Sequence, residues 1–510
     1  ARAAFLPRRF RWLRSMRAPR STTLLVEGIP PERQCDAELL AFFGGMFGKG
    51  AVLEAFVVKD TTCLASMLAE KEAVGNSLQQ ACHKWERAGK DPARRPQHLQ
   101  LTKIVDSIDY FTQRKEEIAC SAKAERARIL AESAVAGGVN SGTGFVTFTS
   151  RADATVALGM EYTADLDQWT VSLPPALDSI RWADLMQNEN AGAARAVLGI
   201  GLIVAFFVAY LPTMVCINYL AKSVDAGPMD LLWSSLAPTA GLTVMVSVQP
   251  TIMICIFRRF FTLRDDAWAQ HRLLRVLLIS DMIFVILVTA VGTSAVGFLD
   301  EIVRNPLNVF DLLGNRLPHA THFYMNYITL QWAFKAFNLT RATTFMKFLV
   351  WRRLYGDEIA KGMSEPEDQD SDGPGCRSAR SVCAALIGII FSTCSPGISL
   401  LVFIQFVFTR LFSGYLLCHA ETRKPDLGGV FWVDMLRFLL IGLGTYVVMM
   451  SGVLYHRSKS SWPSLLAASA LAYVWWAQYR FETQFRWQSL PFAELRQADD
   501  DSPSKGGRAE

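Results

Sequence analysis

Two uncharged stretches constrain the fold of this 510-residue chain more than any other feature. Residues 197–221 and 231–257 contain no Asp, Glu, Lys, Arg or His. At about 1.5 Å of rise per residue, a helix of either length crosses a hydrocarbon core of roughly 30 Å. Buried helices of soluble proteins are normally shorter. The chain is therefore predicted to be a polytopic α-helical membrane protein.

Further apolar segments bring the predicted number of spans to about eight. The predicted spans are residues 197–221, 231–257, 276–299, 323–351, 382–394, 398–418, 438–455 and 462–479. The fifth and sixth are separated at Ser395, Pro396 and Gly397, because this sequence is a turn signal that a straight helix tolerates poorly. One long span there would move the C-terminal tail to the other side of the membrane.

The distribution of basic residues predicts the orientation. Loops 258–275, 352–380 and 419–430 hold twelve Lys and Arg, whereas the loops on the opposite side hold five. Because basic loops stay in the cytosol, the N-terminal domain and the tail at 481–510 are both predicted to be cytosolic. The membrane is predicted to be the plasma membrane or an endomembrane. Residues 357–376, acidic and rich in Gly, Ser and Pro, are predicted to form a disordered loop.

Residues 21–190 are rich in charge and are predicted to form a cytosolic α+β domain before a transmembrane domain at 191–480. A long, charged helical insertion is predicted at 61–136. Around it, hydrophobic alternation and turn residues predict strand 22–28, helix 36–47, strand 52–59, strand 144–149, helix 151–159 and strand 169–173. This order is the split, ferredoxin-like arrangement.

The string GTGFVTF at 142–148 resembles the RNP1 pattern of an RNA-recognition motif (RRM), whose aromatic side chains stack on bases. Two features speak against RNA binding. The partner strand LLVEGIP offers no aromatic residue, and Ser141 stands where a basic residue is expected. The sequence therefore favours an RRM-like domain without nucleic acid as a partner.

The first twenty residues contain seven arginines and no acidic residue. No uninterrupted apolar core follows, which excludes a secretory signal peptide. A basic juxtamembrane segment at 1–20 is favoured, and a mitochondrial presequence is the alternative. The ten cysteines show no CxxC spacing, and HExxH, GxSxG and P-loop motifs are absent from the sequence. Neither an enzyme nor a metal or cofactor site is predicted.

Polar residues within the predicted spans are the candidate functional residues, because they are costly in lipid and usually face protein or water. Asp281 is the only charge in its span, and Gln331, Lys335 and Asn338 share one helical face. This stripe is predicted to line a water-filled conduction path. The alternatives are hydrogen bonding between helices, with Lys335 paired to Asp281, and a site for lipid or substrate.

Two further polar residues, Asn218 and Gln249, lie in the first two spans and complete the predicted pore lining. Each lies near a proline, Pro212 or Pro250, that could bend its helix during gating. Acidic residues in the outer loops are predicted to concentrate cations at the pore mouth, the alternative being ordinary solvated charges. They are Asp225, Asp230, Asp300, Glu301 and Asp311.

Seven stretches, in order from Arg20 to Leu495, carry a family resemblance. They are RSTTLLVEGIPPE, GFVTFTSRADA, LPPALDSIRWADL, LPHATHFYMNYI, SPGISLLVFIQFVF, GGVFWVDMLRFLL and YRFETQFRWQSLPFAEL. Together they resemble the OSCA family of hyperosmolality-gated, calcium-permeable channels, relatives of the anoctamins and the transmembrane channel-like proteins. That family has eleven spans, three of them before the cytosolic domain. The resemblance implies that this chain is N-terminally truncated and that residues 1–17 follow the third span.

The resemblance also implies a function. It implies a pore lined by the first five spans present, in a mechanically or osmotically gated, calcium-permeable cation channel. Permeant cations, membrane lipids and a second copy in a homodimer are the expected partners. One departure stands out: family members usually carry an acid in the pore helix, whereas residues 331–341 hold Lys335 and no acid. An anoctamin-type lipid scramblase is the alternative, since Lys335 would attract headgroup phosphates, and a tethering protein is a third possibility.

Overall fold

The chain forms two compact units, a helical unit (Ala1–Arg9 with Ala194–Gln488) and a sheet unit (Phe10–Ala193 with Ser489–Glu510). Each is described by itself. The computed structural model describes residues 2–48, 50–87, 89, 91, 95–100, 103–165, 167–187, 189–223, 241, 247–283, 321–355, 357–365, 372–422, 427–484, 487, 490–491 and 494–495.

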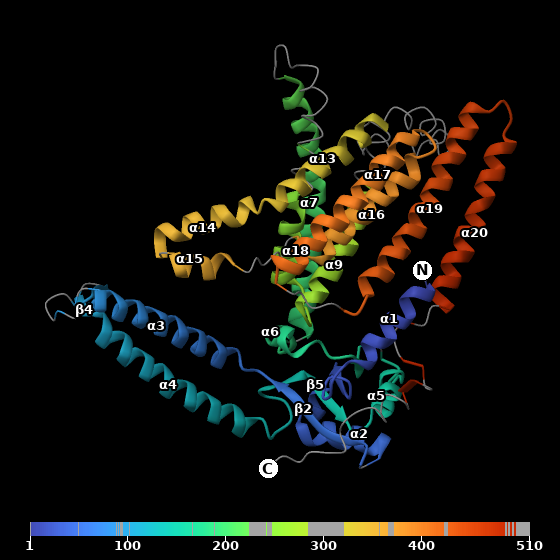
Figure 1. Cartoon of the computed structure of the whole chain (residues 1–510). Helices are drawn as coiled ribbons and strands as arrows, with labels where there is room; N and C mark the ends of the chain where they lie inside the picture. The colour runs from blue at the N-terminus through green and yellow to red at the C-terminus, as the bar shows by residue number, and fades with distance from the viewer. Residues whose placement is uncertain are drawn as a thin grey trace. The chain divides into compact units, whose positions relative to one another are not determined.

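The sheet unit is built on four antiparallel strands (Figure 1). They are β1 (Thr23–Glu27), β2 (Val52–Lys59), β5 (Asn140–Phe148) and β6 (Thr170–Ser172), in the order β2-β5-β1-β6. The four predicted strands are therefore confirmed. Strands β1 and β5 lie in the middle of the sheet, which buries their Leu, Val and Phe side chains.

Two helices cover one face of this sheet. They are α2 (Asp36–Phe47) and α5 (Arg151–Leu158), both predicted from the sequence. Each begins at a capping side chain: Cys35 Sγ accepts from the backbone of Glu38, and Ser150 Oγ accepts from that of Asp153. Phe43 of α2 is fully buried against the sheet and meets the ring of Phe148 edge-on, with 6.2 Å between ring centroids.

The opposite face of the sheet is covered by the segment that follows β6. The segment with η3 (Leu177–Ser179) and α6 (Trp182–Leu185) buries Leu185 against Phe145. The ring of Phe145 also stacks on Phe56 at 5.2 Å and lies 6.0 Å from that of Trp182. Phe145 belongs to the RNP1-like string, so the aromatic side chain that would stack on a base is packed against protein.

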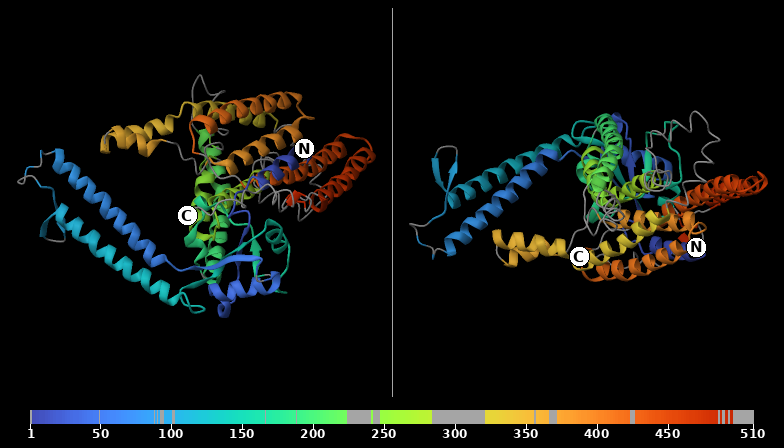
Figure 2. Two further views of the ribbon diagram at one scale, coloured as in Figure 1. Left: turned by 60° about the horizontal axis from the view of Figure 1, so that its bottom comes forward. Right: turned by 90° about the horizontal axis from the view of Figure 1, so that it is seen from above.

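The predicted helical insertion is confirmed as a long antiparallel pair. It consists of α3 (Thr62–Arg87) and α4 (Ser107–Glu132), which run side by side in all views (Figures 1 and 2). Arg114 and Glu70 form an ion pair across the pair at 2.8 Å. A short hairpin, β3 (Gln97–Gln100) with β4 (Lys103–Asp106), closes the tip and was not predicted.

Tyr162 gives the sheet unit a measurable alkaline limit. Burial raises the pKa of this phenol to about 12, and its hydroxyl donates to the Ala157 carbonyl at 2.8 Å. The folded state holds this proton more tightly than the unfolded state. Its contribution to the free energy of unfolding is therefore fully present below about pH 10 and is lost as the pH rises toward 12. In melting scans from pH 8 to 11, Tyr162→Phe should lose less stability than the unmodified protein. Equal losses would contradict this.

The helical unit is a bundle of long helices. The described ones are α1 (Arg2–Arg14), α7 (Glu189–Ser223), residues 247–260, α9 (Asp266–Ser280), α13 (Thr321–Leu339), α14 (Ala342–Tyr355), α15 (Asp357–Ser364), α16 (Pro374–Phe391), α17 (Pro396–Phe408), α18 (Gly414–His419), α19 (Val430–Arg457) and α20 (Trp462–Gln484). Helices α9, α13 and α19 all pack against α16. The buried core of the unit includes Leu386 and Phe391 of α16.

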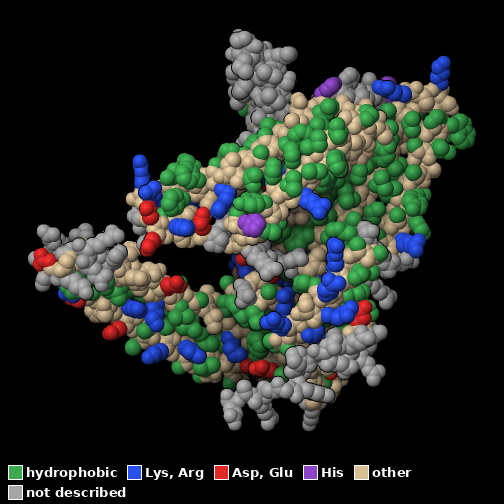
Figure 3. All heavy atoms as spheres, viewed as in Figure 1, with side chains coloured by type: hydrophobic (Ala, Val, Ile, Leu, Met, Phe, Trp, Pro, Cys, Tyr) green, Lys and Arg blue, Asp and Glu red, His purple; other side chains and the backbone are tan. Residues whose placement is uncertain are grey.

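Four of the described helices are long and apolar enough to cross a membrane, in α7, α16, α17–α18 and α19. Their outward faces are apolar: Val197 of α7 is 68% exposed, and hydrophobic side chains cover the visible face over α17 and α19 (Figure 3). Exposed apolar surface of this extent is what lipid tails would cover. The predicted second and third spans lie partly outside the described residues, so the eight-span count stays a prediction.

Three sequence expectations about these helices have clear outcomes. The predicted turn at Ser395 separates α16 from α17, as expected. The disordered loop predicted at 357–376 is wrong at both ends, because α15 begins at Asp357 and α16 at Pro374. Asp357 and Glu358 favour a helix N-terminus, and proline is favoured in the first helical turn. The prediction of one span over 323–351 is also wrong, because α13 ends at Leu339 and a separate helix, α14, begins at Ala342.

The basic segment at the N-terminus is helical and anchored. Within the helical unit, the Arg9 guanidinium donates to the carbonyls of Leu427 at 2.6 Å and Gly428 at 2.7 Å, just before α19. The ring of Phe5 stacks on Trp432 of α19 at 4.4 Å. Carbonyls in a non-helical segment need donors from side chains or water, and Arg9 supplies them here. Arg9 thus holds the chain at the entrance to α19.

Candidate functional site

Two irregular turns, one at the end of α13 and one at the end of α17, define the candidate site. The first is the break between α13 and α14, where Arg341 has φ of 52°. This left-handed conformation cannot continue a right-handed helix. The second is a π-helical turn, Thr409–Ser413 (η7), between α17 and α18. Such turns often occur at functional sites.

Lys335 and Thr409 connect α13 to the π-helical turn. The Lys335 ammonium donates to Thr409 Oγ1, which in turn donates to the carbonyl of Gln405 at 2.7 Å. The ring of Trp332, one turn earlier on α13, meets that of Phe408 edge-on at 5.6 Å. Lys335 is therefore held at the π-helical turn and, within the described part of the chain, forms no ion pair with Asp281.

A small polar cavity of about 40 Å³ lies at this junction. A volume of about 10–15 Å³ suffices for one water molecule, so the cavity has room for a few. Its lining comes from α13, the start of α16 and the π-helical turn. The lining residues are Lys335, Asn338, Asp372, Arg377, Arg380, Thr409, Phe412, Ser413 and Leu416. It will be called the junction cavity.

The arginines of the junction cavity are paired. Arg377 binds Glu421 through two hydrogen bonds of 2.6 and 2.9 Å, and Arg380 binds Asp372 at 2.8 Å. Bidentate arginine–carboxylate pairs fix geometry as well as charge. These pairs hold the N-terminal end of α16 against the segment after α18, so the wall of the cavity is rigidly built.

A second polar cluster joins α9 to α19. Asp434 is 2% exposed, and its carboxylate lies 2.6 Å from His271 Nε2 and 2.8 Å from Arg275 Nε. Arg437, one turn along α19, donates to the other oxygen at 3.1 Å. Removing the carboxylate would leave the guanidinium groups of Arg275 and Arg437 without their shared partner. The cluster is a structural clamp between two helices of the bundle.

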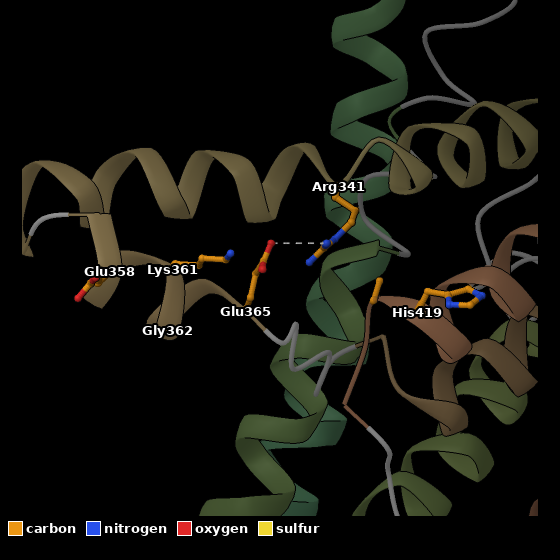
Figure 4. A pocket seen from close by; sticks show the side chains of 7 residues that line it. Arg341, Glu358, Lys361, Gly362, Glu365 and His419 are labelled. Atoms are coloured by element: carbon orange, nitrogen blue, oxygen red, sulfur yellow. Dashed lines mark ion pairs between the residues drawn. The ribbon is translucent and has the colours of Figure 1, made fainter.

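A wider groove of about 530 Å³ lies between α14, α15 and the end of α18 (Figure 4). Arg341 and Glu365 face each other across it at 3.8 Å, and Lys361 and His419 also line it. Lys361 and His419 are exposed, and Arg341 and Glu365 are partly exposed. The groove marks where the helical break at Arg341 opens the bundle toward the charged α14–α15 pair.

The structure places the predicted pore-lining residues in different surroundings. Lys335 and Asn338 line the junction cavity, whereas Gln331 is not part of that lining. Gln249 is buried and donates to Ser280 Oγ at 2.9 Å. Asp281 is 6% exposed and interacts electrostatically with Arg380. The predicted stripe is therefore only partly brought together.

The remaining predicted residues lie in two helices or outside the described residues. Pro250 is buried in the helix at 247–260. Pro212 and Asn218 belong to α7, but their side chains lie outside the described residues. The outer acids also lie outside them: Asp225, Asp230, Asp300, Glu301 and Asp311.

Sequence reasoning missed Arg377, Arg380 and Asp372, because it assigned them to a cytoplasmic loop that ends at 380. The signal was present: Gly373 followed by Pro374 marks a helix start six residues before Arg380. The Asp434 clamp had no comparable signal, since Asp434 and Arg275 are 159 residues apart in sequence.

Two family profiles match most of the chain. The one described as "calcium-dependent channel, 7TM region, putative phosphate" matches residues 198–454, which is 257 of the 510 residues. The one described as "cytosolic domain of 10TM putative phosphate transporter" matches residues 21–184. The first of these regions lies in the helical unit and the second in the sheet unit.

Curated relatives agree with these matches. The Arabidopsis thaliana hyperosmolality-gated Ca²⁺ permeable channel 1.7 is 20% identical over 504 residues, covering 92% of this chain and 62% of the relative. The Schizosaccharomyces pombe calcium permeable stress-gated cation channel 1 is 22% identical over 77% of this chain and 49% of its own length. The uncharacterized protein RSN1 of Saccharomyces cerevisiae is 25% identical over 59% and 33%.

The chain thus spans a third to just under two thirds of the length of these relatives. Two of them are named as channels rather than enzymes. The matched regions describe a membrane domain preceded by a cytosolic one. This protein is an integral membrane protein with a cytosolic N-terminal domain, and it belongs to the calcium-dependent channel family that includes the OSCA-type, calcium-permeable stress-gated cation channels.

Proposed function

We propose that this chain forms the pore of a calcium-permeable cation channel gated by membrane tension or osmotic stress. The observation that carries the proposal is the junction cavity, a polar space between α13 and the π-helical turn within an apolar bundle. Polar groups at such a position are costly unless they face water or protein. Two relatives are named for calcium permeation under hyperosmolality or stress, which supports the proposal.

In this proposal the pathway runs along α13. Lys335 and Asn338 line its inner part, and Gln331, Asp281, Gln249 and Asn218 line the remainder. Tension favours the state with the larger in-plane area. The break at Arg341, the π-helical turn and bends at Pro212 and Pro250 would absorb the change in helix direction. Current through the reconstituted protein under suction tests the proposal; no current at any tension would contradict it.

An anoctamin-type lipid scramblase is the second candidate. The observation that favours it is the Lys335 ammonium, which could attract a headgroup phosphate as lipid crosses along α13. A fluorescent-lipid flip assay in the vesicles used for recording separates the two candidates. Flipping without current would replace the channel with a scramblase.

We also propose the type of the cytosolic domain, the number of spans and the oligomeric state. The strand order β2-β5-β1-β6 with α2 and α5 on one face favours a ferredoxin-like, RRM-like domain at 21–190 that binds no nucleic acid. The proposed transmembrane domain at 191–480 has eight spans, and a second copy completes a homodimer. The membrane would be the plasma membrane or an endomembrane.

Labelling of introduced cysteines tests the eight-span topology. A cysteine at Ser504, in the tail, should be labelled by an impermeant maleimide only after the cells are permeabilised. A cysteine at Ser460, between α19 and α20, should react in intact cells. Labelling at Ser504 from outside would rule out an even number of spans after the cytosolic domain.

Neutralising the outer acids tests whether they concentrate cations. Asp300→Asn with Glu301→Gln should lower the cation conductance in low salt. The difference should shrink at physiological salt, where exposed charges act over roughly 8 Å. Single-channel conductance at several salt concentrations measures this. Equal conductance at low salt would leave these residues as ordinary loop charges.

A further inference from the structure

The junction cavity carries one basic side chain more than its carboxylates neutralise. Three basic residues line it: Lys335, Arg377 and Arg380. Asp372 pairs with Arg380 at 2.8 Å and with Arg377 at 3.3 Å, and Glu421 pairs with Arg377 at 2.6 Å. Within the described part of the chain, Lys335 has no carboxylate at ion-pair distance, and its contact is the hydroxyl of Thr409. Counted over the lining residues alone, the surplus positive charge therefore belongs to Lys335.

The position of this surplus charge makes it effective. Lys335 is held at the π-helical turn, beside a space large enough for water. Its ammonium donates to Thr409 Oγ1 and so occupies a hydroxyl oxygen that a mobile cation could otherwise approach. A fixed charge next to a narrow aqueous path acts on each passing ion with little screening.

We propose that Lys335 is a tethered cation that determines charge specificity: it lowers the occupancy of the junction cavity by permeant cations, divalent ones most strongly. This inference rests on the proposed function for its consequence, but the local charge can be measured without any current. A unit charge about 7 Å away in water changes the local concentration of a monovalent ion about threefold, and that of a divalent ion about ninefold.

Charged thiol reagents measure the local potential directly. Ser413 lines the junction cavity and is replaced by Cys, with background labelling subtracted using protein that keeps Ser413. The purified chain is treated with an anionic (sulfonatoethyl) or a cationic (trimethylammonioethyl) methanethiosulfonate. Lys335→Gln should slow the anionic reagent about threefold and speed the cationic one about threefold, so that the ratio of rates falls about ninefold.

Two matched variants separate charge from side-chain loss. Lys335→Arg keeps the charge and should keep the ratio. Lys347→Gln removes an exposed charge from α14, outside the cavity lining, and should also leave the ratio unchanged. Size-exclusion profiles confirm that each variant is folded. An unchanged ratio in folded Lys335→Gln, or an introduced thiol at position 413 that neither reagent reaches, would overturn the proposal.

Recording distinguishes failure of this inference from failure of the proposed function. If the protein conducts, Lys335→Gln should raise calcium permeability relative to potassium about threefold, since the divalent gain is the square of the monovalent one. A conducting protein whose labelling ratio ignores Lys335 would overturn the inference alone. If the protein never conducts but shows the ninefold change in the labelling ratio, the local charge of Lys335 is supported and the channel function is contradicted.

Discussion

Asp434→Asn is expected to lower the free energy of unfolding by about 3 kcal/mol, the lower end of the range for breaking a buried ion pair. The carboxylate contacts His271, Arg275 and Arg437 within 3.1 Å. An amide of the same shape cannot compensate the guanidinium charges. The effect stays at the lower end because the Arg275 side chain is half exposed and can be solvated.

Thermal unfolding of the purified protein in detergent measures this loss. Glu365→Gln is the matched control, because Glu365 is half exposed and lies 3.8 Å from Arg341. Pairs of that kind contribute about 0–1 kcal/mol, so its melting temperature should barely change. If Asp434→Asn melted at the temperature of the control, the clamp between α9 and α19 would not stabilise the bundle.

Gly375→Ala is the second substitution expected to have a large effect. A methyl group at Gly375 would lie 2.2 Å from the backbone oxygen of Gln270, so α16 and α9 would have to move apart. Side-chain rotation cannot relieve a clash with backbone. Overpacking of this kind costs about 1–3 kcal/mol or more, which exceeds the roughly 1 kcal/mol that alanine gains over glycine in a helix.

Gly362→Ala provides the matched control for this substitution. Gly362 lies within α15, and a methyl group there would have open space around it. The control should therefore melt at or slightly above the temperature of the unmodified protein, whereas Gly375→Ala should melt several degrees lower or fail to accumulate. Equal melting of the two variants would show that α9 and α16 are not in close contact at Gly375.

Local sequence signals predicted the sheet unit well. Strand β2 and helix α2 have the predicted bounds, Val52–Lys59 and Asp36–Phe47. Both rest on near-neighbour information: alternating apolar residues for the strand, and an amphipathic stretch for the helix. The β3–β4 hairpin escaped prediction because each strand has only four residues, too few to show a period.

The candidate site could be predicted only in part. Lys335 and Asn338 were predicted because a stripe of polar residues in an otherwise apolar helix can be recognised from the sequence alone. The break at Arg341 was missed because the residue in the left-handed conformation is an arginine, whereas glycine is the usual sequence signal for that conformation. The carboxylate partner of Arg377 was missed because Glu421 is 44 residues away in sequence, and pairing over that distance has no local pattern.

Current and lipid flipping recorded from one vesicle preparation test directly whether this chain forms a tension-gated, calcium-permeable pore. The reconstituted protein is held in a patch while suction is increased, and fluorescent-lipid flipping is followed in matched vesicles. A calcium-permeable cation current that rises with tension, without lipid flipping, is the result that the pore proposal predicts. Lipid flipping without current, or an absence of current at every tension up to rupture of the patch, would contradict it.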